Sequence, residues 1–402
     1  MTTAAHRRPS ALIAAVALAL LLGLQPVTTD LYLPALPAIK TELHASMHAT
    51  QLTMAALLLS FGLGQLVAGP VADRFGRRPV LLSTLAVYVL ASLAAVLATT
   101  IEALVLVRIV QGAVMAGVVV VARAMVRDLY EPHEGARIMS LGLSGLGVIA
   151  ISSPLLGGWL AGHLGWRTTF VAAAVIGLGT LVFVATQLPE TIRQRNPRAM
   201  HPGPLLASWA TVLRHPTFRA WAGLSAATYG GLFVFLAGSS FVYMQVLGLN
   251  AAQYGLALST SSISYLAGTF VCRRWLVRHG MAGAVRRAAV FTLAGGLSMA
   301  ALAAGGVQTV WAILVPQLLY AFGHGTHQAC GQTGAVGPFP QQAGVAAALA
   351  GFVLAVVAFF VGQWLGLALD GTTRPLAYGI AVGSVAVALI AWTAVQRLGG
   401  AR

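Results

Sequence analysis

The chain has 402 residues, of which 58% are hydrophobic and only 8% are charged. Soluble domains carry about a quarter of their residues as charged ones, so this composition excludes an ordinary soluble protein and indicates an integral membrane protein. The formal net charge of +15 does not indicate nucleic-acid binding, because the basic residues are spread thinly between apolar runs and form no basic helix interleaved with aromatic residues.

Twelve apolar runs follow one another along the chain, each close to the roughly 20 residues that a helix needs to cross a bilayer. The runs are continuous rather than alternating, which predicts α-helices, whose backbone groups bond within their own segment. The expected spans are 10–30, 48–70, 79–98, 103–125, 137–159, 167–188, 219–243, 252–272, 287–305, 309–331, 343–367 and 374–395. The first is expected to be a retained helix rather than a signal peptide, because "LQPVTTD" offers no small-x-small cleavage site.

The longest polar interval follows the sixth run and divides the chain into two sets of six helices. The expected parts are residues 1–188 as an N-terminal six-helix bundle, 189–218 as a cytoplasmic linker and 219–402 as a C-terminal six-helix bundle. Such halves are typical of transporters built from repeats. The sequence therefore predicts an all-α integral membrane fold of twelve transmembrane helices in two six-helix bundles.

Basic residues predict how these helices are oriented. Of the 24 Lys and Arg residues, only Lys40, Arg167 and Arg374 fall in loops on one side of the membrane, and Arg108 falls inside a helix. The others fall on the opposite side, including the arginines before the first run. Because cytoplasmic loops carry an excess of Lys and Arg, both termini are expected in the cytoplasm.

Asp30, in "PVTTDLYLPALPAIK", is the first candidate functional residue. The chain has only nine acidic residues, and this one stands at the far end of an apolar run. A carboxylate at the centre of a membrane helix costs about 2.5–3.5 kcal/mol on insertion scales, so an acid inside the membrane suggests a function by default. The alternative is an interfacial Asp that begins an outer loop, since Tyr32, Pro34 and Pro37 follow closely. The residues alone leave both interpretations open.

Arg108 lies near the start of the fourth run, in "LVRIVQG". An arginine keeps its charge, so its guanidinium group must be paired or face water. It could snorkel to the outer surface, or it could share a polar helix face with Gln111, one turn further in. By chain order, Asp30 is the nearest acidic partner available. The residues alone do not decide between these roles, and the family resemblance described below is what makes Asp30 and Arg108 the expected proton-coupling residues.

The loop between the second and third runs, "GPVADRFGRR", combines glycines with opposite charges. Glycine removes the side chain where helices cross closely or the chain turns, and the aspartate can pair with an arginine or lie at a helix N-terminus. A general excess of basic residues in cytoplasmic loops would explain the arginines but not the aspartate or the glycines. The residues concerned are Gly69, Asp73, Arg74, Gly76, Arg77 and Arg78.

This loop resembles the signature loop of the major facilitator superfamily. "TTDLYLPALP", "RIVQGAVMAGVVVVARAMVRDLY" and "SSPLLGGWLAGHLGWRTTF" resemble the first, fourth and fifth helices of its twelve-helix drug/proton antiporters. "DLYLPALP", "RDLY" and "GPFPQQAGVAAAL" resemble the bicyclomycin/chloramphenicol resistance (Bcr/CflA) branch, and the resemblance covers essentially the whole chain. One departure is Ser153, where many antiporters have Gly before the proline of the fifth-helix motif.

The resemblance implies roles for several of these residues. The aspartate that matches Asp30 lines the central cavity of the family, and the spacing from Arg108 to Gly112 matches the fourth-helix motif. Asp128 at the end of the fourth helix joins the charged loop in a cytoplasmic gate. This gate is expected to latch the two halves together when the outer gate is open.

Small residues and a proline gather in the fifth run, "GLSGLGVIAISSPLLGGWLAG". Small residues allow helices to approach closely, and proline bends a helix. By resemblance, Pro154, Gly157 and Gly158 form the fifth-helix motif. Its role is either general packing or a seal specific to antiporters, and both remain open.

The expected substrate cavity draws on polar and aromatic residues of several runs. Aromatic rings with scattered hydroxyl groups suit an accommodating pocket for amphipathic compounds, although lipid-facing aromatics and packing between helices explain them equally well. The candidates are Tyr32, Gln111, Tyr229, Phe233, His324, His327 and Gln328.

His324 and His327 lie one turn apart in "AFGHGTHQACGQ", which is also a metal-ligand spacing. A zinc site normally needs three or four protein ligands, and only Cys330 stands nearby, so no metal site is expected. The histidines are expected to form hydrogen bonds in a polar cavity, with a second proton carrier as the alternative. Cys272 and Cys330, far apart in the chain, are expected to be two unrelated thiols rather than a disulfide.

Together these patterns predict a transporter and not an enzyme. The expected function is proton-coupled efflux of small, hydrophobic or amphipathic drug-like compounds by alternating access. The alternative is a proton-coupled importer or facilitator of a small metabolite on the same fold. The chain lacks the G-x-x-x-x-G-K-[ST] loop that binds the nucleotide in proteins driven directly by ATP. A membrane sensor would need a soluble signalling domain, for which the polar segments are too short.

The remaining expectations concern partners and location. The expected partners are a small-molecule substrate, protons and the lipid bilayer, with no nucleic acid and no cofactor, and the protein is expected to be a monomer. Its expected place is the bacterial inner (cytoplasmic) membrane, which it crosses many times with both termini in the cytoplasm.

Overall fold

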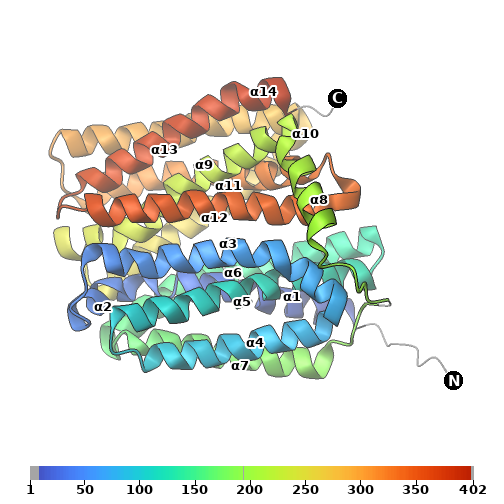
Figure 1. The fold of residues 1–402 in the computed structure, drawn as a ribbon. Helices are drawn as coiled ribbons and strands as arrows, with labels where there is room; N and C mark the ends of the chain where they lie inside the picture. The colour runs from blue at the N-terminus through green and yellow to red at the C-terminus, as the bar shows by residue number, and fades with distance from the viewer. Residues whose placement is uncertain (1–8, 193, 400–402) are drawn as a thin grey trace.

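The computed structural model describes residues 9–192 and 194–399, which form helices joined by short loops (Figure 1). Four arginines that contribute to the predicted orientation, Arg7, Arg8, Arg193 and Arg402, lie outside the described residues. Within the described ranges no strand occurs. The predicted all-α class is confirmed.

The first half of the chain forms six long helical segments, of which the first is broken. This first segment consists of α1 (Ala11–Thr29), the 3₁₀-helix η1 (Leu33–Ala35) and α2 (Leu36–Glu42). The others are α3 (Met47–Phe75), α4 (Arg77–Val96), α5 (Ile101–Leu129), α6 (Pro132–His163) and α7 (Arg167–Gln187).

The second half begins after α8 (Pro202–Arg214), which lies in the predicted linker. It consists of α9 (Pro216–Phe241), the π-helical turn η2 (Val242–Val246), α10 (Ala251–Ala304), α11 (Val310–Val336), η3 (Pro340–Gln342), α12 (Ala343–Ala368), α13 (Arg374–Trp392) and α14 (Ala394–Leu398).

The first membrane segment is longer than the predicted span 10–30, because helical structure continues to the end of α2. Pro34 and Pro37 suggested a loop, but each stands in the first turn of its helix, where the missing N–H breaks no bond. Residues 31–37 are all buried. Asp30 therefore lies within a continuing helical segment and does not begin an outer loop.

α10 holds two of the predicted spans, 252–272 and 287–305. It is 54 residues long, and inside it Gly280 takes φ 65° and ψ −179°. This conformation is open to glycine and strained for other residues. The sequence predicted a loop between the two spans, and the structure replaces it with a break at this one glycine.

Among the described residues, 10 helical segments are long and apolar enough to cross a membrane. α10 counts once in that number, although its 54 residues hold two of the predicted spans. α11 is not among them, because its second half, with the stretch "GHGTHQACGQTG", is polar. With the second crossing of α10 and with α11 added, the predicted set of twelve spans is complete.

The helices gather in two bundles that follow the two halves of the chain. In Figure 1, α9–α13 lie above and α1–α7 below, with α12 and α3 facing each other between them. A second contact between the bundles joins α6 to α10. The boundaries of the three predicted parts, 1–188, 189–218 and 219–402, stay a prediction.

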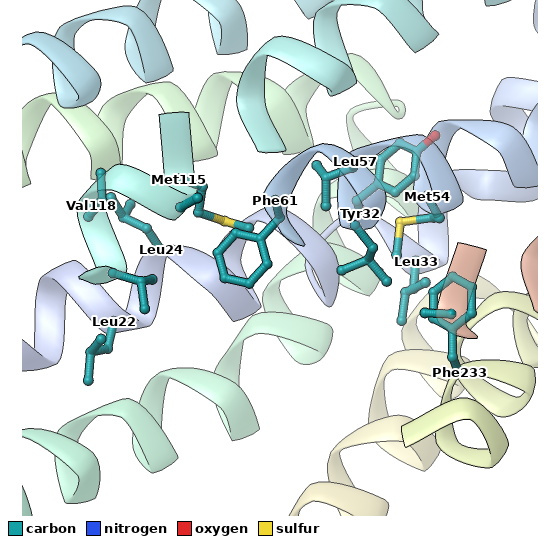
Figure 2. Packing of buried hydrophobic residues seen from close by; sticks show 14 of the residues in the cluster. Leu22, Leu24, Tyr32, Leu33, Met54, Leu57, Phe61, Met115, Val118 and Phe233 are labelled. Carbon is teal, nitrogen blue, oxygen red and sulfur yellow. The ribbon is translucent and has the colours of Figure 1, made fainter. Parts of the chain in front are cut away.

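Apolar side chains from both bundles form one continuous buried cluster. Figure 2 shows part of it, with Met54 of α3 and Leu33 of η1 on the side of the first bundle that faces Phe233 of α9. In lipid such packing acts through van der Waals contact rather than through exclusion of water. The cluster brings the break in the first segment close to the second bundle.

Candidate functional site

Asp30 stands at the C-terminal cap of α1, where its backbone N–H bonds to the Pro26 carbonyl at 2.8 Å. Its side chain is half-buried and accepts a hydrogen bond from the Thr29 hydroxyl at 2.8 Å. No basic side chain within the described ranges forms an ion pair with it. The carboxyl group lies within electrostatic range of Tyr229 on α9 and Tyr254 on α10, and η1, which begins three residues after Asp30, contacts both of these helices. Asp30 therefore belongs to the interface between the bundles.

Arg108 is buried in the first bundle, with 1% of its surface exposed. Its guanidinium group donates to the Thr28 carbonyl at 3.0 Å and to the side-chain oxygen of Gln111 at 3.2 Å. It also lies 4.2 Å from the centre of the Tyr32 ring. The expected pairing with Asp30 is not what the structure shows, since the arginine binds the backbone two residues before it. Arg108 thus holds the last turn of α1.

A hydrogen-bonded network extends this support to α4. The Thr28 hydroxyl shares a hydrogen bond of 2.7 Å with the Tyr88 hydroxyl. The Gln111 amide donates to the Ser92 hydroxyl at 2.9 Å. The sequence analysis missed Tyr88 and Ser92, because a tyrosine and a serine in an apolar run look the same whether they face lipid or a partner helix.

Two of the predicted substrate-cavity residues, Tyr32 and Gln111, are buried in the first bundle. The Tyr32 hydroxyl shares a hydrogen bond of 2.7 Å with Thr53, and its ring stacks against the Arg108 guanidinium. The Tyr32 hydroxyl and the Gln111 amide both have their hydrogen-bond partners within this bundle. The two side chains therefore support Arg108 in this structure.

Three further candidates lie on α9 and α11. The rings of Tyr229 and Phe233 stack with their centres 6.4 Å apart. Phe233 is fully buried, whereas Tyr229 is half-buried and is the one within electrostatic range of Asp30. Gln328 is also half-buried, and its side-chain oxygen has no hydrogen-bond partner in the described ranges. The structure therefore brings Tyr229, of the predicted cavity residues, towards Asp30.

His324 and His327 are buried on α11 and bind threonines of the second bundle. Nδ1 of His324 shares a hydrogen bond of 2.9 Å with Thr228 of α9, and Nε2 of His327 shares one of 3.0 Å with Thr292 of α10. In the part of the chain that the structure describes, no three side chains of metal-binding type come together. Both histidines thus act here as hydrogen-bonding groups between helices.

The charged loop forms a cluster at the arginine-rich end of the molecule, defined as the end where α3 meets α4. Arg77 pairs with Asp73 at 2.7 Å and with Asp128 at 3.1 Å. The Asp73 carbonyl also accepts a bond from the backbone N–H of Asn196 at 2.9 Å. Among the described residues, no hydrogen bond or ion pair of this cluster reaches the second bundle. The predicted latch between the halves is therefore not formed in this state.

The other residues of this loop have different surroundings. Gly69 leaves ordinary room, since an added Cβ would lie 4.0 Å from Val120. The Arg74 guanidinium lies over the Phe75 ring at 5.4 Å. The Arg78 side chain donates to the Leu188 carbonyl at 3.0 Å. The loop is thus tied to the end of α7 as well as to α5.

Glu190, after α7, is a member of this cluster that the sequence analysis missed. Its carboxylate accepts backbone bonds from Arg77 at 3.0 Å and from Arg78 at 3.3 Å, at the N-terminus of α4. An anion is favoured there by the helix dipole. Gly76 makes room for it, with φ 108° and no space for a Cβ beside the carboxylate. An acid directly after the sixth span, in "LPET", was the available signal.

We expect Glu190→Gln to lower the thermal stability of the protein. The amide keeps the size of the side chain, but its NH2 group replaces one of the two carboxylate oxygens that accept the Arg77 and Arg78 N–H groups. Losing a capping bond costs about 0.5–2 kcal/mol. Thermal unfolding in detergent measures the change. The matched control is Glu131→Gln, because Glu131 stands at the N-cap of α6 without a side-chain bond. Equal shifts in melting temperature for both variants would contradict the capping role.

The fifth-helix motif lies where α6 meets both the first segment and the second bundle. An added Cβ at Gly157 would collide with the Leu31 backbone, and one at Gly158 would collide with the Ala251 backbone in α10. The Pro154 carbonyl lies equally close to α10. These small residues therefore permit the contact between the bundles on this side.

Polar contacts close the interface on the α3 side, away from the arginine-rich end. The Gln51 amide of α3 donates to the Ala237 carbonyl of α9 at 2.7 Å. The His48 ring shares a hydrogen bond of 2.7 Å with the Gln363 side chain of α12. With the α6–α10 contact, they hold the bundles together at the end opposite the arginine-rich loops.

Comparison with known proteins is consistent with this architecture. A family model described as Major Facilitator Superfamily matches residues 18–363. The chain is 31% identical over 334 residues to Multidrug resistance protein D of Escherichia coli (strain K12), with 83% of each chain covered. It is 29% identical over 330 residues to the Chloramphenicol resistance protein of Pseudomonas aeruginosa, covering 80% of this chain and 75% of that one.

Among solved structures, the chain is similar to the xylose transporter XylE from E. coli in a partially occluded inward-open conformation. The TM-score is 0.76 at 14% sequence identity, with 96% of this chain and 97% of that chain covered. At this level of identity the likeness shows the fold alone.

Proposed function

The chain belongs to the major facilitator superfamily, and on that premise we propose that it exports small hydrophobic or amphipathic compounds in exchange for protons. It is a multi-pass membrane transporter and not an enzyme, and the resemblance noted in its sequence is confirmed. Relatives named for multidrug and chloramphenicol resistance support export as the direction of transport.

The observation that carries the proposal is the position of Asp30. Its half-buried carboxyl group lies at the interface, within range of Tyr229 and Tyr254, and forms no ion pair in the described ranges. Burial disfavours the charged form of a carboxyl group. In our proposal Asp30 takes a proton from outside and releases it inside, so that proton and substrate occupy the site in turn.

The energy for accumulation comes from the proton gradient. One charge crossing 100 mV supplies about 2.3 kcal/mol, and one pH unit supplies about 1.4 kcal/mol. One proton in each cycle is thus enough to sustain accumulation of a neutral compound by more than tenfold, since about 1.4 kcal/mol corresponds to that factor.

In this scheme Arg108 positions the end of α1 and Tyr229 lines the substrate path. In the same scheme the contacts of α3 and α6 with the second bundle form the outer gate. The Arg77 cluster forms the cytoplasmic gate and engages the second bundle when the outer gate opens. The proposed location is the inner membrane of a bacterium, with both termini cytoplasmic and the protein acting as a monomer.

Proteoliposomes test the function directly. Vesicles are prepared acid inside and alkaline outside, and chloramphenicol and ethidium serve as probes. A proton-coupled exporter lets protons leave and draws the probe into the vesicles, and nigericin abolishes this uptake. Probe leaving the vesicles under the same gradient would overturn exchange and support a proton-coupled importer, while movement that ignores the gradient would indicate a facilitator.

A further inference from the structure

The fold brings the two cysteines of the chain into contact. Cys272 on α10 and Cys330 on α11 are 58 positions apart in sequence, yet their Sγ atoms lie 3.7 Å apart. Both thiols are free, and each is only 2% exposed. The sequence analysis expected two thiols rather than a disulfide, and both are thiols here. It did not foresee their contact, because separation in the chain says nothing about which helices pack together.

Glycines explain why α10 and α11 come so close at this level. Gly268, one turn before Cys272, has no room for a Cβ because the Phe322 carbonyl fills the space. Gly325 on α11 lies equally close to the Tyr265 backbone of α10. A disulfide requires such an approach, since its Cα atoms lie about 4.4–6.8 Å apart.

We propose that Cys272 and Cys330 form a redox modification site that closes to a disulfide and joins α10 to α11. With hydrogen peroxide as the oxidant, one thiolate attacks a peroxide oxygen, which gives a sulfenic acid and, after protonation of the leaving hydroxide, water. The second thiol attacks the sulfenic sulfur, the S–S bond forms, and a second water leaves. Two thiols and one peroxide thus give one disulfide and two waters, and a dithiol reductant reverses the step once the chain unfolds and exposes the bond.

The burial of the two thiols determines which reagents reach them. Because both sulfur atoms are covered, a bulky maleimide does not reach them in the folded protein, whereas peroxide is close to water in size. A thiol held against a second thiol forms the disulfide before further oxidation to a sulfinic acid, which is irreversible in most proteins. Thiols persist in reducing compartments, so the disulfide forms only under oxidative stress.

Closing the disulfide has a structural consequence. α10 carries contacts to the first bundle, among them the bond from the Ser259 hydroxyl to the Ile151 carbonyl at 2.9 Å. The main partners of α11 lie in the second bundle. The disulfide therefore fixes an interface helix to an inner helix, and by restricting the unfolded chain it raises the thermal stability. None of this depends on the substrate of the transporter.

Thiol counting and thermal unfolding test the proposal. The purified wild-type protein is treated with peroxide or with dithiothreitol, then denatured and labelled with maleimide, and its peptides are analysed by mass spectrometry. We expect two reactive thiols after dithiothreitol and none after peroxide, a peptide linked through Cys272 and Cys330, and a higher melting temperature in the peroxide-treated protein than in the dithiothreitol-treated protein.

Cys272→Ser and Cys330→Ser are the matched controls, because serine is similar in size and cannot form a disulfide. Each variant should keep one thiol and show no rise in melting temperature after peroxide. Two thiols that stay reactive in the oxidised wild-type protein would overturn the proposal. So would separate sulfinic acids or a disulfide between two chains, seen as a dimer on a non-reducing gel.

Discussion

Asp30→Asn abolishes proton-driven transport and leaves the protein folded. Asparagine is nearly the same size as aspartate, and its side-chain oxygen still accepts the bond from the Thr29 hydroxyl that the carboxylate accepts at 2.8 Å. It cannot take up or release a proton at neutral pH. We therefore expect gradient-driven uptake of chloramphenicol into proteoliposomes to fall to the rate of protein-free vesicles.

A second measurement distinguishes loss of proton coupling from loss of probe binding. Exchange of labelled for unlabelled probe across a membrane without a pH gradient needs no proton, so Asp30→Asn should retain it. Proton release measured with a pH-sensitive dye on addition of probe should vanish in the same variant. Wild-type levels of gradient-driven uptake in the variant would remove Asp30 from the mechanism.

Asp370→Asn provides the matched control. Asp370 lies between α12 and α13, outside the spans, and is exposed. Hydrogen bonds from the Thr372 hydroxyl and N–H hold the pKa of this carboxyl below its usual range, so it carries a charge at neutral pH. The same change at this position removes a carboxylate without touching the interface, and transport should remain at the wild-type rate.

The sequence predicted the twelve spans because apolar length is a strong local signal, and α11 shows where that signal ends. The apolar residues at its start were sufficient to predict the span 309–331, although the polar residues of its second half make α11 too hydrophilic on average to count as a span, and these polar residues are buried between helices. The end of the first segment was predicted wrongly, because Pro34 and Pro37 occur in loops and in first helical turns alike. Prolines alone do not distinguish these two environments.

Part of the candidate site was predictable because residue composition is also a physical signal. Acids are rare in this chain, so Asp30 was conspicuous, and the structure places it at the interface. Glu190 and the contact of Cys272 with Cys330 were not predictable, because each depends on which helix ends or faces meet across long stretches of sequence. Residue type and local spacing carry no information about such meetings.

Arg108→Lys should reduce transport by about 10- to 150-fold although it keeps the positive charge. Arginine presents several donors in a rigid plane, whereas lysine has one ammonium group. The guanidinium binds the Thr28 carbonyl at 3.0 Å and Gln111 at 3.2 Å while stacking on Tyr32, and one ammonium group cannot do all three. Losing one charged hydrogen bond costs about 1.5–3 kcal/mol, which corresponds to this range if it falls on the transport step.

The transport kinetics of Arg108→Lys distinguish a positioning role from a structural one. Since Arg108 acts through the last turn of α1, the maximal rate should fall while the probe concentration at half-maximal rate stays near the wild-type value. Arg374→Lys, at the exposed first residue of α13, is the matched control and should transport normally. A wild-type maximal rate in Arg108→Lys would show that charge alone is sufficient. A loss of rate that merely follows a loss of folded protein would reduce Arg108 to a structural residue, because the network around Thr28 would then stabilise the bundle without setting the position of Asp30.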